Sequence, residues 1–261
     1  MSVVSDEATA EEVLVEQRDR ILVITINRPQ AKNAVNATVS RGLADAMDRL
    51  DGDPTLSVGV LTGAGGTFCA GMDLKAFARG ERVDIEGRGL GFTQSPPAKP
   101  LIAAVEGYAL AGGTEVALAT DLIVAANDAA FGIPEVKRGL VAGGGGLLRL
   151  PQRIPYAVAM ELALTGDNLS ATRAHELGLV NVLAEPGGAL DAAIALAEKI
   201  TANGPLAVAA TKKIIVEGRE WSADERWNKQ LQILAPVFMS NDAREGAVAF
   251  AEKRPPKWTG S

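Results

Sequence analysis

Two glutamates follow glycine or proline turns in segments that are otherwise apolar. Glu115 comes after the pair Gly112-Gly113, and Glu135 comes directly after Pro134. A carboxylic acid in apolar surroundings is expected to have a raised pKa, which lets it carry protons near neutral pH. A purely structural role fits each residue as well, Glu115 as a first-turn helix acid that the helix dipole favours and Glu135 as a loop acid.

Four glycine-rich segments are expected at the carboxyl ends of predicted strands, where open α/β sheets bind ligands. Glycine lets the backbone approach a ligand closely, and a following helix leaves its first N–H groups free to donate. Two such N–H groups aimed at one oxygen would form an oxyanion hole, which suits chemistry through an enolate or a tetrahedral anion. Ordinary βα connections contain such turns too, so the spacing alone leaves both interpretations open. The segments are 63–73, 107–115, 134–139 and 143–146.

The chain contains a single histidine, His175, and a single cysteine, Cys69. These counts exclude intrachain disulfides and the common zinc sites built from several Cys and His ligands. The sequence around His175 predicts an exposed helix, and Cys69 stands in a buried-looking run without a histidine nearby, so neither is expected to be catalytic. The sequence also lacks a dinucleotide fingerprint, a phosphate loop and a Gly-x-Ser-x-Gly elbow. Proton chemistry is therefore expected to run on carboxylates.

The charge balance restricts the partners. There are 26 Lys and Arg against 32 Asp and Glu, a net charge of −6, which argues against a nucleic-acid surface or a polybasic membrane patch. The longest run of apolar residues and glycine, 139–148, is too short for the roughly 20 residues that span a bilayer. Residues 1–10 lack a signal-peptide pattern. We therefore expect a cytoplasmic protein that does not enter a membrane, in which an unpaired thiol stays reduced.

The first half of the chain alternates strand and helix patterns. Period-2 patterns predict an antiparallel hairpin, and a helix that carries Val39, Leu43 and Met47 is expected to begin at Asn36 or Asn33. Strands separated by helices indicate βαβ units and a mainly parallel sheet. The predicted strands are 13–15, 21–26, 58–62, 101–105 and 122–126.

Strand signals fade after Gly143, and the second half is predicted to be helical. Between the halves, residues 81–100 are rich in glycine and proline, and we interpret them as a mobile loop that contacts substrate rather than as core. The predicted helices are 157–164, 171–177, 190–201, 205–217, 223–234 and 242–253.

Four motifs in order along the chain resemble the enoyl-CoA hydratase/isomerase (crotonase) superfamily: residues 27–34, 68–74, 107–115 and 131–139. The likeness extends from the first hairpin to residues 242–254. It implies an α/β fold of the ClpP/crotonase type, a spiral of ββα units followed by a C-terminal helical trimerisation region. The core with the active site would comprise residues 1–200 and the oligomerisation region residues 201–261. A homotrimer, or a hexamer formed as a dimer of trimers, is the implied assembly.

The resemblance also implies an acyl-CoA thioester as substrate, so that coenzyme A is part of the substrate and neither a separate cofactor nor a metal is expected. By position, the backbone N–H groups of Met72 and Gly112 would hold the thioester oxygen. A few local lysines would let an acidic protein hold this phosphate-rich ligand. Asp73 could also be a third acid, but its place at a helix start favours the role of a helix cap. The positions associated with substrate or CoA are Lys32, Ala70, Asp73, Leu74, Lys75, Phe250 and Lys253, the last two reaching a neighbouring subunit's site.

The two glutamates indicate the subfamily. Members of the superfamily that isomerise, cleave or dehalogenate usually replace one of them, whereas hydratases resemble this chain in having Glu at both positions. The resemblance therefore implies a hydro-lyase of fatty-acid or related acyl-CoA degradation. It would add water syn across a trans-2-enoyl-CoA to give a 3-hydroxyacyl-CoA. Glu115 would deprotonate the water that attacks the β-carbon, Glu135 would deliver a proton to the α-carbon, and the N–H pair would carry the enolate charge.

One segment departs from the hydratase pattern. Many hydratases have Pro-Gly-x-Gly-Gly-Thr-Gln-Arg where this chain has residues 142–149, Ala-Gly-Gly-Gly-Gly-Leu-Leu-Arg, which partly resembles carnitinyl-CoA dehydratase-like members. An enoyl-CoA isomerase, another crotonase-type enzyme or a carnitinyl-CoA dehydratase-like enzyme therefore stays an alternative. Outside enzymes, a catalytically inactive acyl-CoA-binding or RNA-binding relative is the remaining one. The two acids argue against an inactive protein, and the negative charge argues against RNA.

Overall fold

The computed structural model describes residues 11–261, so the expectation about a signal peptide in residues 1–10 lies outside the described residues. Six strands form the main sheet, in the order β1-β2-β3-β4-β6-β9. β1 and β2 are antiparallel and the other neighbours are parallel, which confirms the predicted hairpin and the mainly parallel sheet. The strands are β1 (Val13–Arg18), β2 (Ile21–Ile26), β3 (Val58–Gly63), β4 (Leu101–Val105), β6 (Leu122–Ala126) and β9 (Val182–Ala184).

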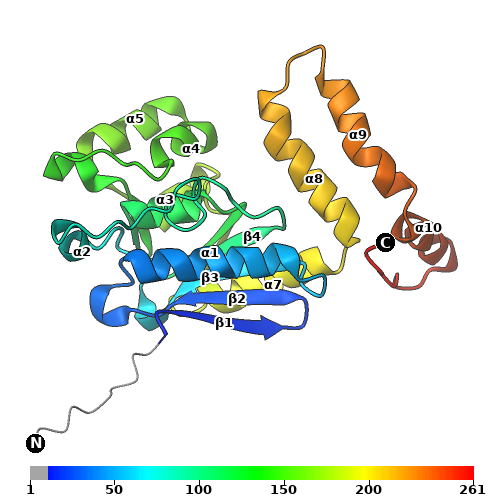
Figure 1. Ribbon diagram of the computed structural model, residues 1–261, viewed down its shortest axis with the longest axis horizontal. Coiled ribbons are helices and arrows are strands. Elements are labelled where there is room, and N and C mark those ends of the chain that lie inside the picture. The colour runs from blue at the N-terminus through cyan, green and yellow to red at the C-terminus, as the bar shows by residue number, and fades with distance from the viewer. Residues whose placement is uncertain (1–10) are drawn as a thin grey trace, which may run out of the picture.

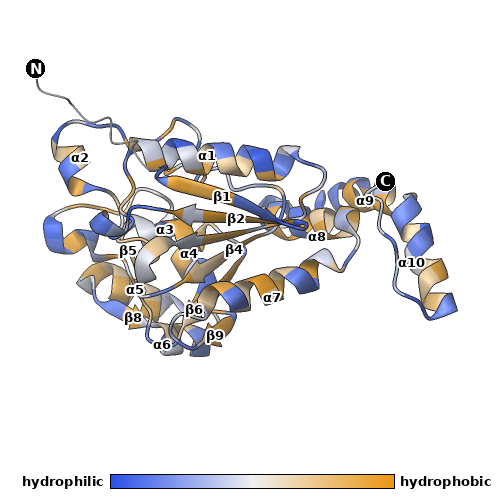
Figure 2. Ribbon diagram, turned by 90° about the horizontal axis from the view of Figure 1, so that it is seen from below, coloured by the Kyte–Doolittle hydropathy of each residue, from blue (hydrophilic) through white to orange (hydrophobic). Residues whose placement is uncertain are grey.

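Helices cover both faces of this sheet, with α1 on one side and α7 on the other (Figures 1 and 2). Because successive side chains of a strand point to opposite faces of the sheet, neighbouring residues pack into two separate hydrophobic cores. Ile21 and Val23 pack on the side of α7 with its Ala193 and Ala197, whereas Leu22 belongs to the cluster on the other side. The helices are α1 (Ala37–Gly52), α2 (Leu74–Ala78), α3 (Gly112–Leu118), α4 (Gly146–Arg153), α5 (Tyr156–Thr165), α6 (Ala171–Glu176), α7 (Ala189–Thr201), α8 (Pro205–Glu217), α9 (Arg226–Phe238) and α10 (Asn241–Glu252).

A second sheet of three short strands, β5 (Tyr108–Leu110), β7 (Ala130–Gly132) and β8 (Asn168–Ser170), stands apart from the first. Each of two ββα units places its first strand in the large sheet and its second in the small one: β4 with β5, followed by α3, and β6 with β7, followed by the 3-10 helix η3 (Pro134–Arg138). The expected spiral of ββα units is therefore confirmed. Its repetition brings the beginnings of α3 and η3 to the same edge.

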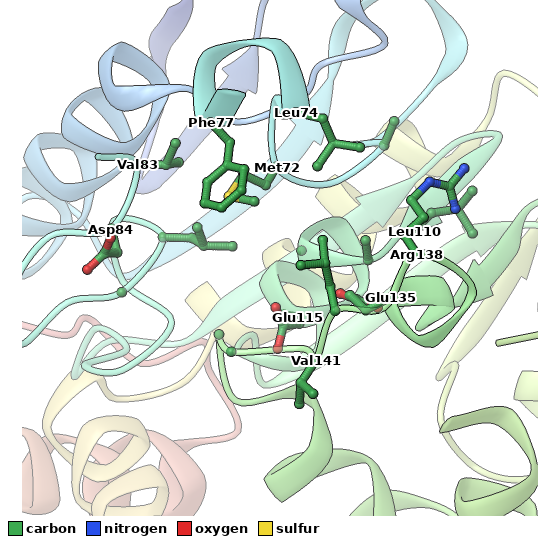
Figure 3. A pocket seen from close by; sticks show the side chains of 18 of the residues that line it. Met72, Leu74, Phe77, Val83, Asp84, Leu110, Glu115, Glu135, Arg138 and Val141 are labelled. Carbon is green, nitrogen blue, oxygen red and sulfur yellow. The ribbon is translucent and has the colours of Figure 1, made fainter. Parts of the chain in front are cut away.

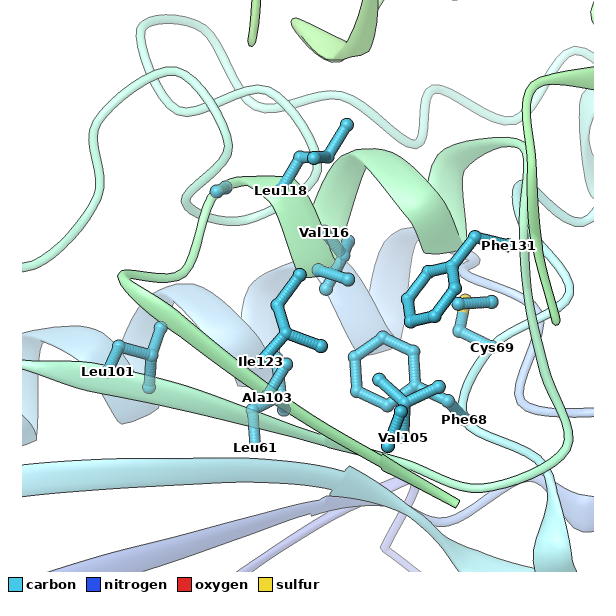
Figure 4. Packing of buried hydrophobic residues seen from close by; sticks show 14 of the residues in the cluster. Leu61, Phe68, Cys69, Leu101, Ala103, Val105, Val116, Leu118, Ile123 and Phe131 are labelled. Carbon is cyan, nitrogen blue, oxygen red and sulfur yellow. The ribbon is translucent and has the colours of Figure 1, made fainter. Parts of the chain in front are cut away.

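The core beneath α3 locks this edge in place. Phe68, Cys69 and Phe131 are almost completely buried there, next to strand residues of the large sheet (Figure 4). Close packing of this kind resists small displacements of the backbone. The turns at the ends of the strands therefore rest on a rigid base.

The prediction of a purely helical second half was wrong in two places, because β8 and β9 each contribute three residues to a sheet. A three-residue strand is too short to show a period of two. The predicted helices after position 156 are all present with small shifts of their ends, whereas α4 was not predicted. Its first residue, Gly146, ends a run of four glycines, and Pro151 lies inside it.

The loop formed by residues 81–100 also differs from expectation. Its irregular backbone was predicted correctly, but Phe92 and Thr93 are completely buried and Val83 is nearly so. Gly91 allows the backbone of this loop to approach α1 closely, since a Cβ built at Gly91 would lie 2.5 Å from the carbonyl oxygen of Ser40 in α1. The loop is thus part of the core as well as of the surface.

The C-terminal helices pack differently from the rest. Neither α8 nor α9 has a buried residue, and the two helices form a hairpin that stands away from the sheets (Figure 1). Large apolar side chains on this region are exposed, among them Trp227, Phe238 and Phe250. Among residues 11–261, no helix combines the length and apolar character that crossing a bilayer requires.

Candidate active site

A cavity of about 670 Å³ lies at the edge where the strand ends meet (Figure 3). It is bordered by α2 and the turn before it, by the loop formed by residues 81–100, by the beginnings of α3 and η3, and by residues 143–146, which we call the glycine loop. Apolar side chains make up much of the wall, as expected for a pocket that receives a hydrophobic group. They include Met72, Leu74, Phe77, Val83, Leu90, Leu110, Leu140 and Val141.

Glu115 lies in the first turn of α3 and is only 3% exposed. Its Oε1 accepts a hydrogen bond of 2.9 Å from the N–H of Gly146, the first residue of α4. Burial raises the pKa of Glu115 above its usual value, while the backbone N–H groups of the glycine loop and the positive charge of Arg149 act in the opposite direction. The carboxylate is therefore desolvated but supplied with groups that favour its charged form.

Glu135 reaches the same cavity from η3, beside Pro134. Its Oε2 is buried and has no hydrogen-bond partner among the described residues. Burial raises the pKa of Glu135, and the negative charge of Glu115 raises it further. The expectation that both acids have raised pKa values is met. Burial is the largest cause for both, whereas the neighbouring hydrogen bonds and charges differ between them.

Two backbone N–H groups at the cavity wall have no acceptor within the described part of the chain. A parallel bridge with Val35 engages Gly71 O and Asp73 N at 2.8 Å each, which turns the N–H of Met72 to the opposite side. The N–H of Gly112 belongs to the first turn of α3, where no intrahelical acceptor exists. A Cβ built on Gly112 would lie 3.4 Å from Met72 N, so the two donors flank the same small space.

The backbone around these donors is held in unusual conformations. Ala111 has φ 51° and ψ −126°, and Gly71 has φ 104°. A left-handed conformation at a residue with a side chain costs free energy and persists only where the surroundings enforce it. Here the N–H of Ala111 donates to Gly132 O at 2.9 Å, and its carbonyl accepts from Glu115 N at 3.2 Å. These bonds fix the direction of the Gly112 N–H and the position of Glu115 together.

The motif at residues 27–34 contains two residues whose structural contacts were not predicted from the sequence. Arg28 forms ion pairs with Asp73, at 3.1 Å, and with Glu12, at 2.9 Å. Asn33 is completely buried and donates to the carbonyl oxygens of Ala64 and Thr67. Both tie the turn that carries Met72 to the first hairpin. An arginine and an asparagine beside a tight proline turn were the available signal.

Asp73 has its carboxylate fully engaged in the protein. It accepts from Lys75 N at 3.0 Å and from Ala76 N at 3.1 Å, and so caps α2, in addition to its ion pair with Arg28. The alternative explanation of Asp73 as a helix cap is confirmed. A third reactive acid is not formed, because a carboxylate with a cation and two donors holds no proton to transfer near neutral pH.

The structure brings together only part of the predicted CoA positions. Ala70 and Leu74 line the cavity. The exposed Lys32 lies in the turn beside it, where Ala70 N donates to Lys32 O at 3.0 Å, and the exposed Lys75 lies in α2. Phe250 and Lys253, in contrast, belong to α10 and its end, far from this cavity within one chain (Figure 1).

The remaining two candidates have no part in the cavity. Burial raises the pKa of the Cys69 thiol to about 12, which keeps it an unreactive thiol. His175 lies exposed on α6, and its Nδ1 is 2.8 Å from Val180 O. Both observations agree with the expectation that neither residue is catalytic.

Comparisons with known proteins agree with this geometry. The model of the family described as enoyl-CoA hydratase/isomerase matches residues 16–261. A crystal structure of enoyl-CoA hydratase EchA1 from Mycobacterium marinum superposes with a TM-score of 0.95 at 83% identity, over 96% of this chain and 100% of that one. Enoyl-CoA hydratase EchA19 of Mycobacterium tuberculosis is 45% identical over 260 residues, 95% of this chain and 96% of that protein. Carnitinyl-CoA dehydratase of Proteus mirabilis is 41% identical over 252 residues, 93% and 96% of the two chains.

The chain therefore belongs to the enoyl-CoA hydratase/isomerase family. The resemblance seen in the four motifs and the α/β crotonase fold expected from it are confirmed. Membership makes the protein an enzyme of acyl-CoA metabolism and implies an acyl-CoA substrate.

Proposed function

We propose that this chain is an enoyl-CoA hydratase in which Glu115 and Glu135 move the protons of a syn addition of water to trans-2-enoyl-CoA. Its family and its 83% identity to a hydratase of known structure support the activity. The observation that carries the mechanism is the pairing, in one apolar cavity, of two desolvated carboxylates with two N–H donors that have no acceptor within residues 11–261. Carboxylates in contrasting environments are the usual source of an acid and a base at one site.

The N–H groups of Met72 and Gly112 receive the thioester oxygen and stabilise the enolate that forms when water attacks. Donors of this kind act on charge that develops in the transition state, and each is typically worth about 3–4 kcal/mol of barrier. They need no reorganisation, because the backbone on either side is already fixed. The product of the step is an enolate with a hydroxyl group on its β-carbon.

Glu115 is the base in this scheme and Glu135 is the acid. The glycine loop donates to Glu115 and favours its ionised form, which takes a proton from the water that attacks the β-carbon. Oε2 of Glu135 has no donor among residues 11–261, and the side chain faces the charge of Glu115, so Glu135 retains its proton and delivers it to the α-carbon. The substrate gains one hydroxyl group and one proton, while Glu115 ends the step protonated and Glu135 ends it ionised. The starting state returns when Glu115 releases its proton and Glu135 takes one up.

Binding of CoA is assigned to Lys32, Ala70, Leu74 and Lys75 of the same chain, with Asp73 holding the turn on which three of them stand. Phe250 and Lys253 would come from a neighbouring subunit. This requires residues 201–261 to act as an oligomerisation region beside a core of residues 1–200, in a homotrimer or a dimer of trimers. The support is the absence of buried residues in α8 and α9 and the 88% exposure of Phe250.

We place this activity in the degradation of fatty acids or related acyl groups in the cytoplasm, where the single thiol of Cys69 would stay reduced. The second candidate is dehydration of a carnitinyl-CoA type substrate. It is favoured by the 41% identity to the Proteus mirabilis enzyme and by Leu147 and Leu148, which stand where many hydratases have a Thr-Gln pair.

Product analysis tests the proposal. With trans-2-butenoyl-CoA, hydration removes the absorbance of the conjugated thioester and adds the mass of one water, whereas isomerisation leaves the mass unchanged. Glu115→Gln and Glu135→Gln should each lower kcat by about a thousandfold, the usual scale for a general acid or base. Unchanged turnover in either variant contradicts the two-acid mechanism, and turnover confined to carnitinyl-CoA selects the second candidate.

A further inference from the structure

Arg149 is a half-buried cation on α4 whose guanidinium reaches two separate segments of the site. Its Nη2 donates to the carbonyl oxygen of Thr93 at 2.5 Å, and its Nη1 donates to that of Gly144 at 3.4 Å. Thr93 is completely buried in the loop of residues 81–100, where its hydroxyl accepts from Leu90 N at 3.1 Å. One side chain thus joins the cavity wall to the glycine loop.

The glycine loop lies between Arg149 and Glu115 with no room on either side. A Cβ on Gly144 would lie 2.8 Å from Oε2 of Glu115, and one on Gly146 would lie 2.9 Å from its Cγ. On the other side, a Cβ on Gly145 would lie 2.3 Å from Nη1 of Arg149, and Gly145 itself has φ 99°. Four consecutive glycines have no side chains with which to hold their own conformation, and glycine loses the most freedom on ordering.

We propose that Arg149 is a positioning residue that holds the glycine loop against Glu115. Bonds to two carbonyl oxygens from one planar guanidinium are a rigid link that lysine cannot reproduce. The link fixes the N–H of Gly146, whose bond of 2.9 Å orients the Glu115 carboxylate. The proposal rests on the role of Glu115 as the base in the proposed function.

The charge of Arg149 supplies a second, separable effect. The charged groups that face Glu115 are Arg149 from α4 and Glu135 from η3, while Glu81, Arg82, Asp84 and Arg138 border the cavity from the surrounding loops. Arg149 lowers the pKa of Glu115, whereas the negative charge of Glu115 raises the pKa of Glu135. Removal of this positive charge would raise the pKa of Glu115 and move the acid limb of the pH profile of kcat/KM to higher pH.

Two substitutions separate position from charge. Arg149→Lys keeps the charge and loses the two-carbonyl link, whereas Arg149→Gln keeps a donor and loses the charge. Arg153 provides the matched control, because it lies one turn further along α4, is also partly buried, and donates to a single carbonyl oxygen, that of Thr120, at 2.6 Å, away from the glycine loop. Arg153→Lys and Arg153→Gln therefore report the cost of changing a buried arginine on the same helix.

For the folded full-length enzyme with trans-2-butenoyl-CoA, we expect Arg149→Lys to lower kcat by about a hundredfold, the scale of a misplacement of about 1 Å at a reacting group. Its acid limb should stay in place and KM should change little. Arg149→Gln should lose at least as much and shift the acid limb to higher pH. Both Arg153 variants should keep the kcat and the pH profile of the unmodified chain, whatever their melting temperatures.

The inference is overturned if the Arg149 variants lose no more kcat than their Arg153 counterparts, or if the acid limb of Arg149→Gln stays where it was. If Arg149→Gln does not fold, kcat of Arg149→Lys against Arg153→Lys decides alone. Glu115→Gln, run beside them, keeps the two proposals apart. Full activity in that variant refutes the role of Glu115, whereas its inactivity together with unaffected Arg149 variants refutes only the role of Arg149.

Discussion

Glu115 and Glu135 share one cavity, yet the protein surrounds their carboxylates with opposite kinds of groups. Glu115 receives an N–H bond from the glycine loop and faces a guanidinium. Oε2 of Glu135, in contrast, is buried without a partner in the described part of the chain and faces a negative charge. Burial raises both pKa values, so burial alone cannot determine which carboxyl acts as the base and which as the acid. The contrast supports the proposal that hydrogen bonds and neighbouring charges, more than burial, decide which of the two acids keeps its proton.

Adding a single methyl group next to Glu115 is expected to change kcat most among the substitutions that alter the surroundings of the two acids. In Gly144→Ala the new Cβ would lie 2.8 Å from Glu115 Oε2 and would force the carboxylate to move. We expect kcat to fall by about a hundredfold, because small displacements of a base are costly. Stopped-flow or steady-state loss of enoyl-thioester absorbance measures this directly.

Gly143→Ala is the matched control for that substitution. A Cβ at Gly143 meets nothing within 4 Å, and the residue is not in a left-handed conformation. Because Gly143 borders the cavity but its new methyl group would not reach Glu115, the control should retain kcat within about twofold, whatever its effect on KM. Equal losses in the two variants would show that the loop as a whole, rather than its contact with Glu115, is sensitive.

These contacts also show what could be predicted from the sequence. The main strands were predicted because their apolar residues form short runs or alternate, and the two donors were found through their glycines and a family resemblance. The bond between Gly146 and Glu115 joins residues 31 apart, and that between Arg28 and Asp73 joins residues 45 apart. No local pattern encodes such pairings. The burial of Phe92 could not be predicted either, because the glycines and prolines around it indicate only an irregular backbone.

On the side of Glu135, the expected effect is a gain in stability with a loss of activity. A buried carboxyl whose pKa is raised in the folded state destabilises that state once pH exceeds its unfolded value, and the penalty is complete above the folded pKa. Glu135→Gln removes this penalty. We expect the free energy of unfolding near neutral pH to rise by about 1 kcal/mol, a common gain when a functional group is removed from a site.

Thermal unfolding as a function of pH checks this sign. The gain of Glu135→Gln should vanish as pH falls below the ordinary range of glutamate, because the unmodified Glu135 is then protonated in both states. Glu115→Gln should gain less, because the glycine-loop N–H groups and Arg149 stabilise the ionised carboxylate and a neutral amide loses part of that stabilisation. A larger gain for Glu115→Gln than for Glu135→Gln would contradict the assignment of base and acid.

The smallest effect is expected at Asp73, the third acid at this edge, whose oxygens are all engaged. Asp73→Asn keeps an acceptor for Lys75 N and Ala76 N and loses only the ion pair with Arg28, which still has Glu12. The two side chains of that pair are 12% and 14% exposed, so we expect a loss of about 1 kcal/mol of stability. Both kcat and KM should stay within about threefold. A large rise in KM instead would mean that Asp73 contacts the substrate itself. A carboxylate with all its hydrogen bonds made within the protein could then still belong to the binding site. The different surroundings of the acids would no longer explain their different roles.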